Sequence, residues 1–293
     1  MSRLEVLKTY KIYIGGKFPR TESGRFYSPK IGGNSLGNIC LSSRKDFRNA
    51  VVAARSAFGS WSAATAYNRS QILYRIAEML EGRKAQFVEE LIQQGATKNQ
   101  AEKELEASID RIIYYAGWCD KYTQLFSAVN PVATPHFNFT TPEPMGVVSI
   151  FAPEENSLLG LVSTIIPVIA SGNTCVILAS EKLPLCAITF AEVVNSSDVP
   201  GGVINILTGQ RNELLEHMAS HMDVNAFLYA GNNKKEMLSI QKLAVDNLKR
   251  VRLKDFTNIF SSEHETPYFI EDFVEMKTTW HPIEKISVSG SGY

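Results

Sequence analysis

The chain has few cysteines, no surplus of charge of either sign and no long apolar run. Its 293 residues include 30 basic and 30 acidic side chains, so its formal net charge is zero at pH 7. A balanced charge does not favour binding to nucleic acid or to an anionic membrane surface. No apolar run reaches membrane-spanning length, and residues 1–5 do not resemble a signal peptide. We therefore expect a globular, cytoplasmic protein with no nucleic-acid or membrane partner.

The four cysteines are too few for a disulfide scaffold, and they lack the spacing of a zinc site. Cys175 falls in a predicted buried strand, while Cys119 and Cys186 fall on predicted helices without a neighbouring histidine. His217 and His221 are four residues apart, but no third metal ligand is evident. We therefore predict no metal site and assign no catalytic nucleophile.

The first part of the chain predicts a hairpin followed by amphipathic helices. Residues 10–18 alternate in polarity around Gly15-Gly16, as in a hairpin with a tight turn. Ser43 and Asp46 have the spacing of a capping box, which marks the start of a helix. Apolar residues at helical spacing then predict three successive helices, over residues 47–58, 72–95 and 99–122.

Residues 121–142 interrupt this helical pattern. Pro131 and Pro135 exclude a continuous helix, while residues 136–141 alternate like an exposed strand. The edge of an exposed strand presents unpaired backbone groups, and it is a site of association unless another segment covers it. We therefore expect this segment to form an arm.

The most regular part of the sequence is the repeated strand, turn and helix pattern of residues 143–258. Short apolar runs predict buried strands over residues 145–151, 174–179, 203–207 and 226–230. Helical patterns cover residues 157–170, 184–194, 211–219 and 232–245. Asn232 is the expected N-cap of the last of these helices. Strands that alternate with helices predict an α/β fold with a parallel sheet, whose ligands bind at the carboxyl ends of the strands.

Motifs in this region resemble those of the cofactor domain of aldehyde dehydrogenases. They are P-E-P-M-G-V-V, P-E-E-N-S-L-L, S-G-N-T-C-V-I-L-A-S-E, V-P-G-G-V-I-N-I-L-T-G and D-V-N-A-F-L-Y-A-G-N. They follow one another in the family's order and spacing, without a gap, from Pro142 to Asn232. The resemblance implies a Rossmann-like parallel sheet with flanking helices, an NAD(P) cofactor, and protruding β-arms that join subunits.

The resemblance also implies where a cofactor would bind. The residues that match cofactor-binding positions of the family are Ser180, Glu181, Gly209, Gly231 and Asn232. However, Leu178 replaces the lysine that holds the adenosine ribose, and Glu236 replaces the closing glycine of the pyrophosphate turn. A negative side chain at that turn opposes a phosphate. We therefore expect a vestigial site at which NAD(P) binding is weak or lost.

The catalytic positions of the family are not kept. Glu155 matches its oxyanion-binding asparagine, Lys254 matches its general-base glutamate, and no segment matches the domain that carries its nucleophilic cysteine. After Asp255 only a short stretch precedes residues 273–280, which resemble the family's carboxyl-terminal arm. Glu154 and Glu155 could form an acid/base pair, but we expect a solvated turn. We therefore predict no catalytic residue.

The resemblance divides the chain into four parts. These are the hairpin and helical part of the cofactor domain (1–120), a β-arm (121–142), the Rossmann-like core (143–258), and a carboxyl-terminal arm and tail (259–293). The whole is similar to the truncated second module of two-module aldehyde dehydrogenases.

We predict a non-catalytic structural or regulatory subunit of an aldehyde dehydrogenase, which associates with a full-length subunit or with itself into an oligomer. Two alternatives stay open. One is an NAD(P)-dependent aldehyde oxidoreductase that acts together with a partner subunit, and the other is a nucleotide-sensing module.

Overall fold

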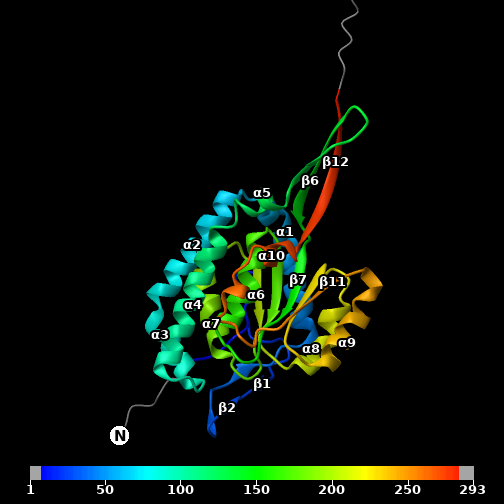
Figure 1. Ribbon diagram of the computed structural model, residues 1–293. Coiled ribbons are helices and arrows are strands. Elements are labelled where there is room, and N and C mark those ends of the chain that lie inside the picture. The colour runs from blue at the N-terminus through cyan, green and yellow to red at the C-terminus, as the bar shows by residue number, and fades with distance from the viewer. Residues whose placement is uncertain (1–7, 284–293) are drawn as a thin grey trace, which may run out of the picture.

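A computed structural model describes residues 8–283 of the chain (Figure 1). The prediction for residues 1–5 and the tail of the segment 259–293 lie outside these residues. Figure 1 shows a body in which helices pack around a central sheet, and an arm that extends away from the body. Within residues 8–283, no helix has both the length and the apolar character needed to cross a membrane.

A parallel five-stranded sheet forms the centre of the body, in the order β11-β10-β7-β8-β9. Its strands are β7 (Val147–Phe151), β8 (Thr174–Leu178), β9 (Ile204–Leu207), β10 (Ala226–Ala230) and β11 (Arg250–Lys254). Every residue of β7 to β10 is buried, which explains their mainly apolar sequences. The edge strand β11 is half-buried and alternates basic with apolar residues. The predicted α/β fold with a Rossmann-like parallel sheet is confirmed.

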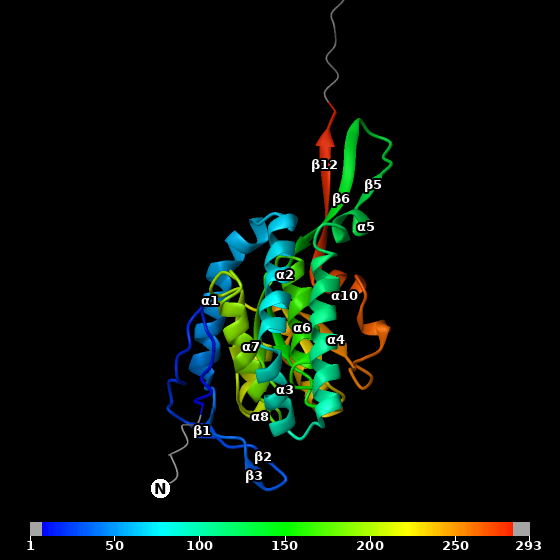
Figure 2. The same ribbon diagram turned by 90° about the vertical axis from the view of Figure 1, so that its left-hand side faces the viewer.

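Helices cover both faces of the sheet. Against one face lie α6 (Leu159–Ala170) and α7 (Leu185–Asn195), with α2 (Ala66–Gly82), α3 (Lys84–Gln93) and α4 (Lys98–Ala116) outside them (Figures 1 and 2). Against the other lie α1 (Arg44–Ala63), α8 (Arg211–Ser220) and α9 (Lys234–Leu243). Alternate residues of each strand point to opposite faces, so Val148 joins one core and Val147 the other.

The amino-terminal elements follow the predicted pattern with two differences. The capping box of Ser43 and Asp46 is present at the start of α1. The single helix predicted over residues 72–95 is broken at Arg83 into α2 and α3, although buried apolar residues continue across the break. The predicted hairpin of residues 10–18 forms only at its tip, where Ile14 pairs with Lys17 around Gly15-Gly16, while Tyr13 pairs with Ile206 beside the main sheet. Four two-residue strands follow: β1 (Phe26–Tyr27), β2 (Lys30–Ile31), β3 (Asn34–Ser35) and β4 (Ile39–Cys40).

The arm is a three-stranded antiparallel sheet in the order β12-β6-β5. It follows the short helix α5 (Tyr122–Phe126) and contains β5 (Ala128–Asn130), β6 (His136–Pro144) and β12 (Val274–Pro282). β12 pairs with β6 along its whole length, from Val274–Pro144 to Pro282–His136. The carboxyl-terminal strand therefore pairs with the arm of its own chain. Within residues 8–283, β12 forms one outer edge of the arm, and the other edge consists of β5 and the part of β6 that β5 does not pair.

Residues 255–273 connect β11 with the arm. They contain a 3₁₀ turn (Ser262–His264) and the short helix α10 (Tyr268–Glu271). Their apolar side chains enter the core on the α6 side of the sheet: Phe256, Ile259, Phe269, Ile270 and Phe273. Arg111 of α4 is 1% exposed, and it donates to Ser163 Oγ at 2.6 Å and to the carbonyl of Ile259 at 3.0 Å. This connection is therefore a packed cover of the body.

Candidate functional site

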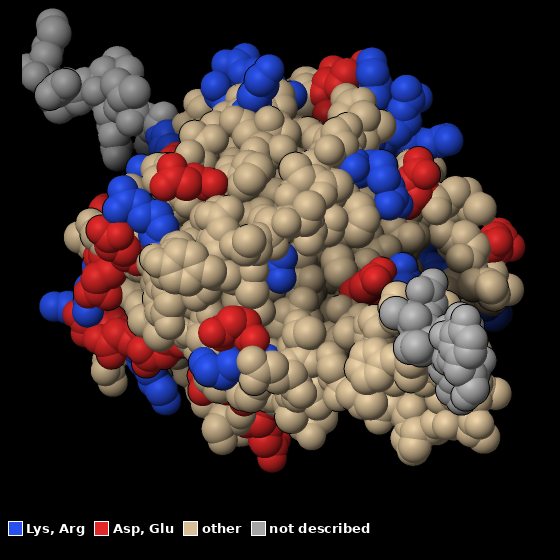
Figure 3. Space-filling view, turned by 90° about the horizontal axis from the view of Figure 1, so that it is seen from above, with Lys and Arg blue, Asp and Glu red and all other residues tan. Residues whose placement is uncertain are grey.

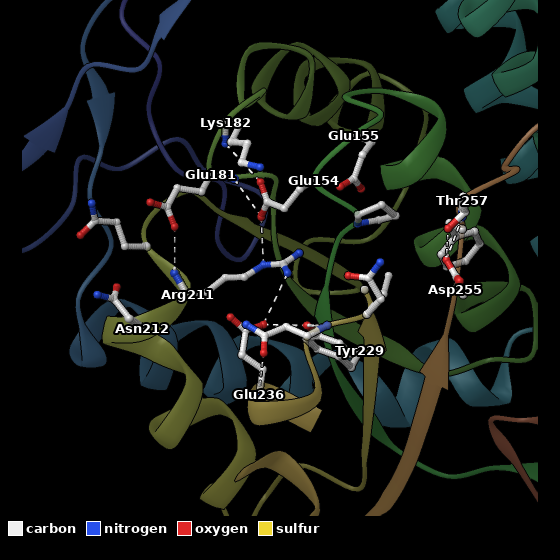
Figure 4. Close-up of a pocket in the computed structure, with 17 residues that line it drawn as sticks. Glu154, Glu155, Glu181, Lys182, Arg211, Asn212, Tyr229, Glu236, Asp255 and Thr257 are labelled. Atoms are coloured by element: carbon white, nitrogen blue, oxygen red, sulfur yellow. Dashed lines mark hydrogen bonds and ion pairs between the residues drawn. The ribbon is translucent and has the colours of Figure 1, made fainter. Parts of the chain in front are cut away.

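A cleft of about 630 Å³ lies at the carboxyl ends of the parallel strands, where open α/β sheets bind ligands (Figure 4). It is formed by the segments that follow β7, β8, β9, β10 and β11. The lining residues are Pro153 to Glu155, Glu181, Lys182, Gln210 to Asn212, Tyr229 to Asn233, Glu236, and Asp255 to Thr257.

The guanidinium of Arg211 lies in the middle of this cleft (Figure 4). Arg211 is the first residue of α8, and its side chain is 11% exposed. Its Nε lies 2.9 Å from Glu154 Oε1, and its Nη1 lies 3.7 Å from Glu236 Oε2. Its Nη2 donates to the carbonyl of Ala152 at the end of β7. Arg211 thus connects the start of α8 with the segment after β7 and with the first turn of α9.

Aromatic rings form the wall beneath this guanidinium. Its central carbon lies 5.4 Å from the ring centroid of Phe151 and 5.7 Å from that of Tyr229, which are cation–π distances. The hydroxyl of Tyr229 donates to Glu236 Oε2 at 2.7 Å. Burial, together with this bond to the Glu236 carboxylate, raises the pKa of Tyr229 to about 12. Tyr229 therefore stays a donor at neutral pH and holds Glu236 against Arg211.

Glu154 organises the loop after β8. Its carboxylate accepts from Ser180 Oγ at 2.8 Å, from the Lys182 amide at 3.2 Å and from the Glu181 amide at 3.3 Å. Its side chain is 14% exposed, so the expectation of a solvated turn is wrong for Glu154. Glu155 is exposed and lies apart from this network (Figure 4). The two carboxylates therefore do not form an acid/base pair.

Three of the five residues predicted to bind a cofactor line the cleft. They are Glu181, Gly231 and Asn232. Ser180 lies at the wall through its bond to Glu154. Gly209 lies outside the lining, and a side chain there would meet the backbone nitrogen of Ser42 at 3.3 Å.

The N-cap of α9 is Asn233, whose Oδ1 accepts from the amides of Lys235 and Glu236, so the assignment to Asn232 is wrong. Asn232 instead lines the cleft, one residue before the cap. Sequence reasoning missed Arg211 altogether. Its position just after the turn of β9 is the only local signal, because its partners are far away in the sequence.

The charge of the cleft does not fit the pyrophosphate of a dinucleotide. The acidic and basic residues of the lining are Glu154, Glu155, Glu181, Glu236, Asp255, Lys182 and Arg211. Five carboxylates therefore face two cations, and the charge of Arg211 is already matched by Glu154 and Glu236. An added pyrophosphate would meet excess negative charge in a partly desolvated site.

This chain matches the aldehyde dehydrogenase family over residues 18–254, which is most of its length. It belongs to the aldehyde dehydrogenase family. Among similar curated proteins, cytosolic 10-formyltetrahydrofolate dehydrogenase of Mus musculus is 31% identical over 262 residues. The putative aldehyde dehydrogenase DhaS of Bacillus subtilis is 32% identical over 254 residues. The matches cover 87% and 84% of this chain but 29% and 50% of those proteins.

Solved aldehyde dehydrogenases have the same fold. The NAD⁺ complex of the enzyme from Bacillus cereus superposes with a TM-score of 0.80 at 25% identity, covering 85% of this chain and 51% of that one. A second structure, PnpE from Pseudomonas sp. WBC-3, gives 0.79 at 26% identity. This chain thus spans about half or less of the length of these aldehyde dehydrogenases, and the family match ends at Lys254, the last residue of β11.

The residues that stand at catalytic positions of aldehyde dehydrogenases by resemblance have other contacts here. Lys254 Nζ lies 2.7 Å from Asp272 Oδ2 and 4.9 Å from the ring centroid of Phe269. A lysine held in an ion pair cannot serve as the carboxylate base whose position it takes. Glu155 offers a carboxylate where the family places an amide donor.

The cysteines do not supply a nucleophile to the cleft. All four are buried, and none is among the residues that line the cleft. Burial raises the pKa of Cys119 and of Cys175 to about 12, and it raises the pKa of Cys186 strongly as well. Such thiols stay protonated at neutral pH. Across residues 8–283, no group of three histidine, cysteine or acidic side chains could hold a metal ion, and His217 and His221 are not part of one.

Proposed function

We propose that this member of the aldehyde dehydrogenase family is a non-catalytic structural or regulatory subunit, which associates with a full-length aldehyde dehydrogenase subunit or with itself. The observation that carries the proposal is the ion-pair network of Arg211, Glu154 and Glu236. It places the chain's own paired charges in the wall of the cleft at the strand ends. The phosphates of a cofactor would meet an arginine that is already paired with two carboxylates.

The surroundings of the cleft support the same conclusion. Lys254 is engaged with Asp272, and the four cysteines are buried away from the cleft. Removal of a single oxyanion donor typically lowers an enzyme's rate by about 10²–10³. Here an acidic side chain takes that position, so we expect the described residues to give no measurable aldehyde oxidation.

The arm supports association with another subunit. It stands away from the body in both ribbon views (Figures 1 and 2), and neither of its faces is covered by a layer of helices. Val129 is 68% exposed, Phe137 47% and Trp280 56%. A thin sheet with exposed apolar residues and free edges is stabilised when another chain adds a strand or covers a face. Figure 3 looks down on this end of the molecule, where charged side chains lie mainly around the rim.

Two measurements test the proposal. Purified chain should form no NADH or NADPH from aldehydes above a no-protein control. An aldehyde dehydrogenase subunit, or a second copy of this chain, should co-purify with it from its native cell. Activity of the isolated chain, retained when each cysteine is changed to serine, would overturn the non-catalytic role.

The two alternatives predict other results. Activity that appears only with a co-purified partner would favour the NAD(P)-dependent oxidoreductase. Tight nucleotide binding without activity would favour the sensing module. We place the protein in the cytoplasm, and fractionation of its native cells checks this location.

A further inference from the structure

β11 carries three cations on one face at the edge of the sheet. Arg250, Arg252 and Lys254 alternate with Val251 and Leu253. The two apolar residues pack on the α9 side of the sheet. The cations therefore point to the opposite face, because successive side chains of a strand alternate. Half-buried cations on such a face need partners.

The carboxylate of Asp272 forms ion pairs with two of these cations. Arg252 Nε lies 2.9 Å from Asp272 Oδ1, and Lys254 Nζ lies 2.7 Å from Asp272 Oδ2. The side chain of Asp272 is 17% exposed. Each carboxylate oxygen thus lies at ion-pair distance from a different residue of β11, which places the carboxylate between the two cations.

The third cation continues this arrangement toward the arm. Arg250 Nη1 donates to the carbonyl of Val274 at 2.7 Å and to that of Asp272 at 3.2 Å. Its Nη2 donates to Glu275 Oε1 at 2.9 Å. The three cations of β11 therefore contact Asp272, Val274 and Glu275, around the start of β12.

The root of the arm, residues 272–275, lies beside these cations. Phe273 is fully buried, and its carbonyl accepts from Asn173 Nδ2 at 2.7 Å. Beyond Glu275, all the remaining residues of β12 are exposed. β12 pairs with β6 along its whole length, so the two strands leave the body together. β12 has nine residues. A strand of that length is about 30 Å long, so a rotation of about 10° at its root would move its tip by about 5 Å.

We propose that Arg252 and Lys254 form a clamp on Asp272 that fixes the direction in which the arm leaves the body. The position that matches the family's general base thereby serves to position the arm. Exposed ion pairs contribute little to stability, so the claim concerns geometry rather than the free energy of unfolding. The further consequence, that the clamp presents the arm to a partner, rests on the proposed function.

The direction of the arm can be measured as a distance within the full chain. Ser239 on α9 and Thr279 on β12 are both exposed, whereas the four native cysteines are buried. Spin labels on S239C and T279C report the separation of body and arm by pulsed electron paramagnetic resonance. The D272N variant should shift the mean distance or broaden its distribution by several ångströms. The matched control is D246N, which removes an exposed carboxylate that is not part of the clamp and should leave the distribution unchanged.

The outcomes separate the possible roles of Asp272. A D272N distribution equal to that of the unsubstituted labelled chain overturns the clamp, even if the melting temperature falls, because lost stability alone does not reorient an arm. If D272N does not fold, the distance distribution of the K254M variant tests the clamp instead. It leaves Arg252 on Asp272, so a smaller shift supports the clamp and no shift overturns it. No partner takes part in the measurement, so a failure of the proposed association would leave this result standing.

Discussion

Replacing Arg211 tests whether the cleft is held together by its own ion pairs. The R211M variant keeps a long side chain over Phe151 and Tyr229 but removes the guanidinium. Glu154 and Glu236 would then face each other across the cleft without a cation, with side chains 14% and 25% exposed. The carbonyl of Ala152 would also lose its donor.

Loss of one member of a fully buried ion pair costs about 3–5 kcal/mol, while an exposed pair contributes about 0–1 kcal/mol. The carboxylates here are partly solvated, so we expect the free energy of unfolding to fall by about 2–3 kcal/mol. Urea denaturation followed by circular dichroism measures this change. Neutralising one remaining carboxylate, as in E154Q/R211M, should recover about 1 kcal/mol, since the unmatched charge causes much of the loss.

The matched control is R75M, because Arg75 forms an exposed ion pair with Glu78 on α2. It should change the free energy of unfolding by less than about 0.5 kcal/mol. If R211M is as stable as R75M, or if E154Q/R211M is no more stable than R211M, the network does not hold the cleft together.

Three further predictions follow from other parts of the chain. Calorimetry with NAD or NADP should give no binding at micromolar concentration, because the cleft has excess negative charge; a micromolar or tighter Kd would contradict this. Burial lowers the pKa of Lys249 from 10.5 to about 8. The unfolded chain then binds the extra proton, so stability relative to K249M should rise as pH increases from about 8 to 9.5, and equal pH profiles would exclude this role. Glu104 Oε1 accepts from the amides of Leu158 and Leu159 at 2.8 and 3.1 Å. Thermal unfolding should show a loss of about 1–3 kcal/mol for E104A and less for E104Q, whose carbonyl can still accept, and equal losses would argue against this capping role.

Much of the fold could be predicted because its signals are local. The strand predicted over residues 226–230 is β10 with the same bounds, since a buried strand of a parallel sheet is apolar throughout. The capping box of Ser43 could also be predicted, because its two residues are close together in the sequence. The break at Arg83 could not be predicted, because buried residues at helical spacing continue from α2 into α3. Asn232 and Asn233 are equivalent by composition, and only the backbone geometry selects the second as the cap.

The sequence by itself determined the α/β pattern and the resemblance to aldehyde dehydrogenases, because apolar periodicity, turn residues and motif spacing are properties of contiguous residues. Only the tertiary structure decided which charges meet in the wall of the cleft. The strand order places β7 between β10 and β8, which brings Glu154, Arg211 and Glu236 within ion-pair distance although they lie far apart in the chain. It likewise decided that Lys254 meets Asp272 and that β12 covers β6. Such contacts depend on how the elements pack, and no local pattern of residues encodes them.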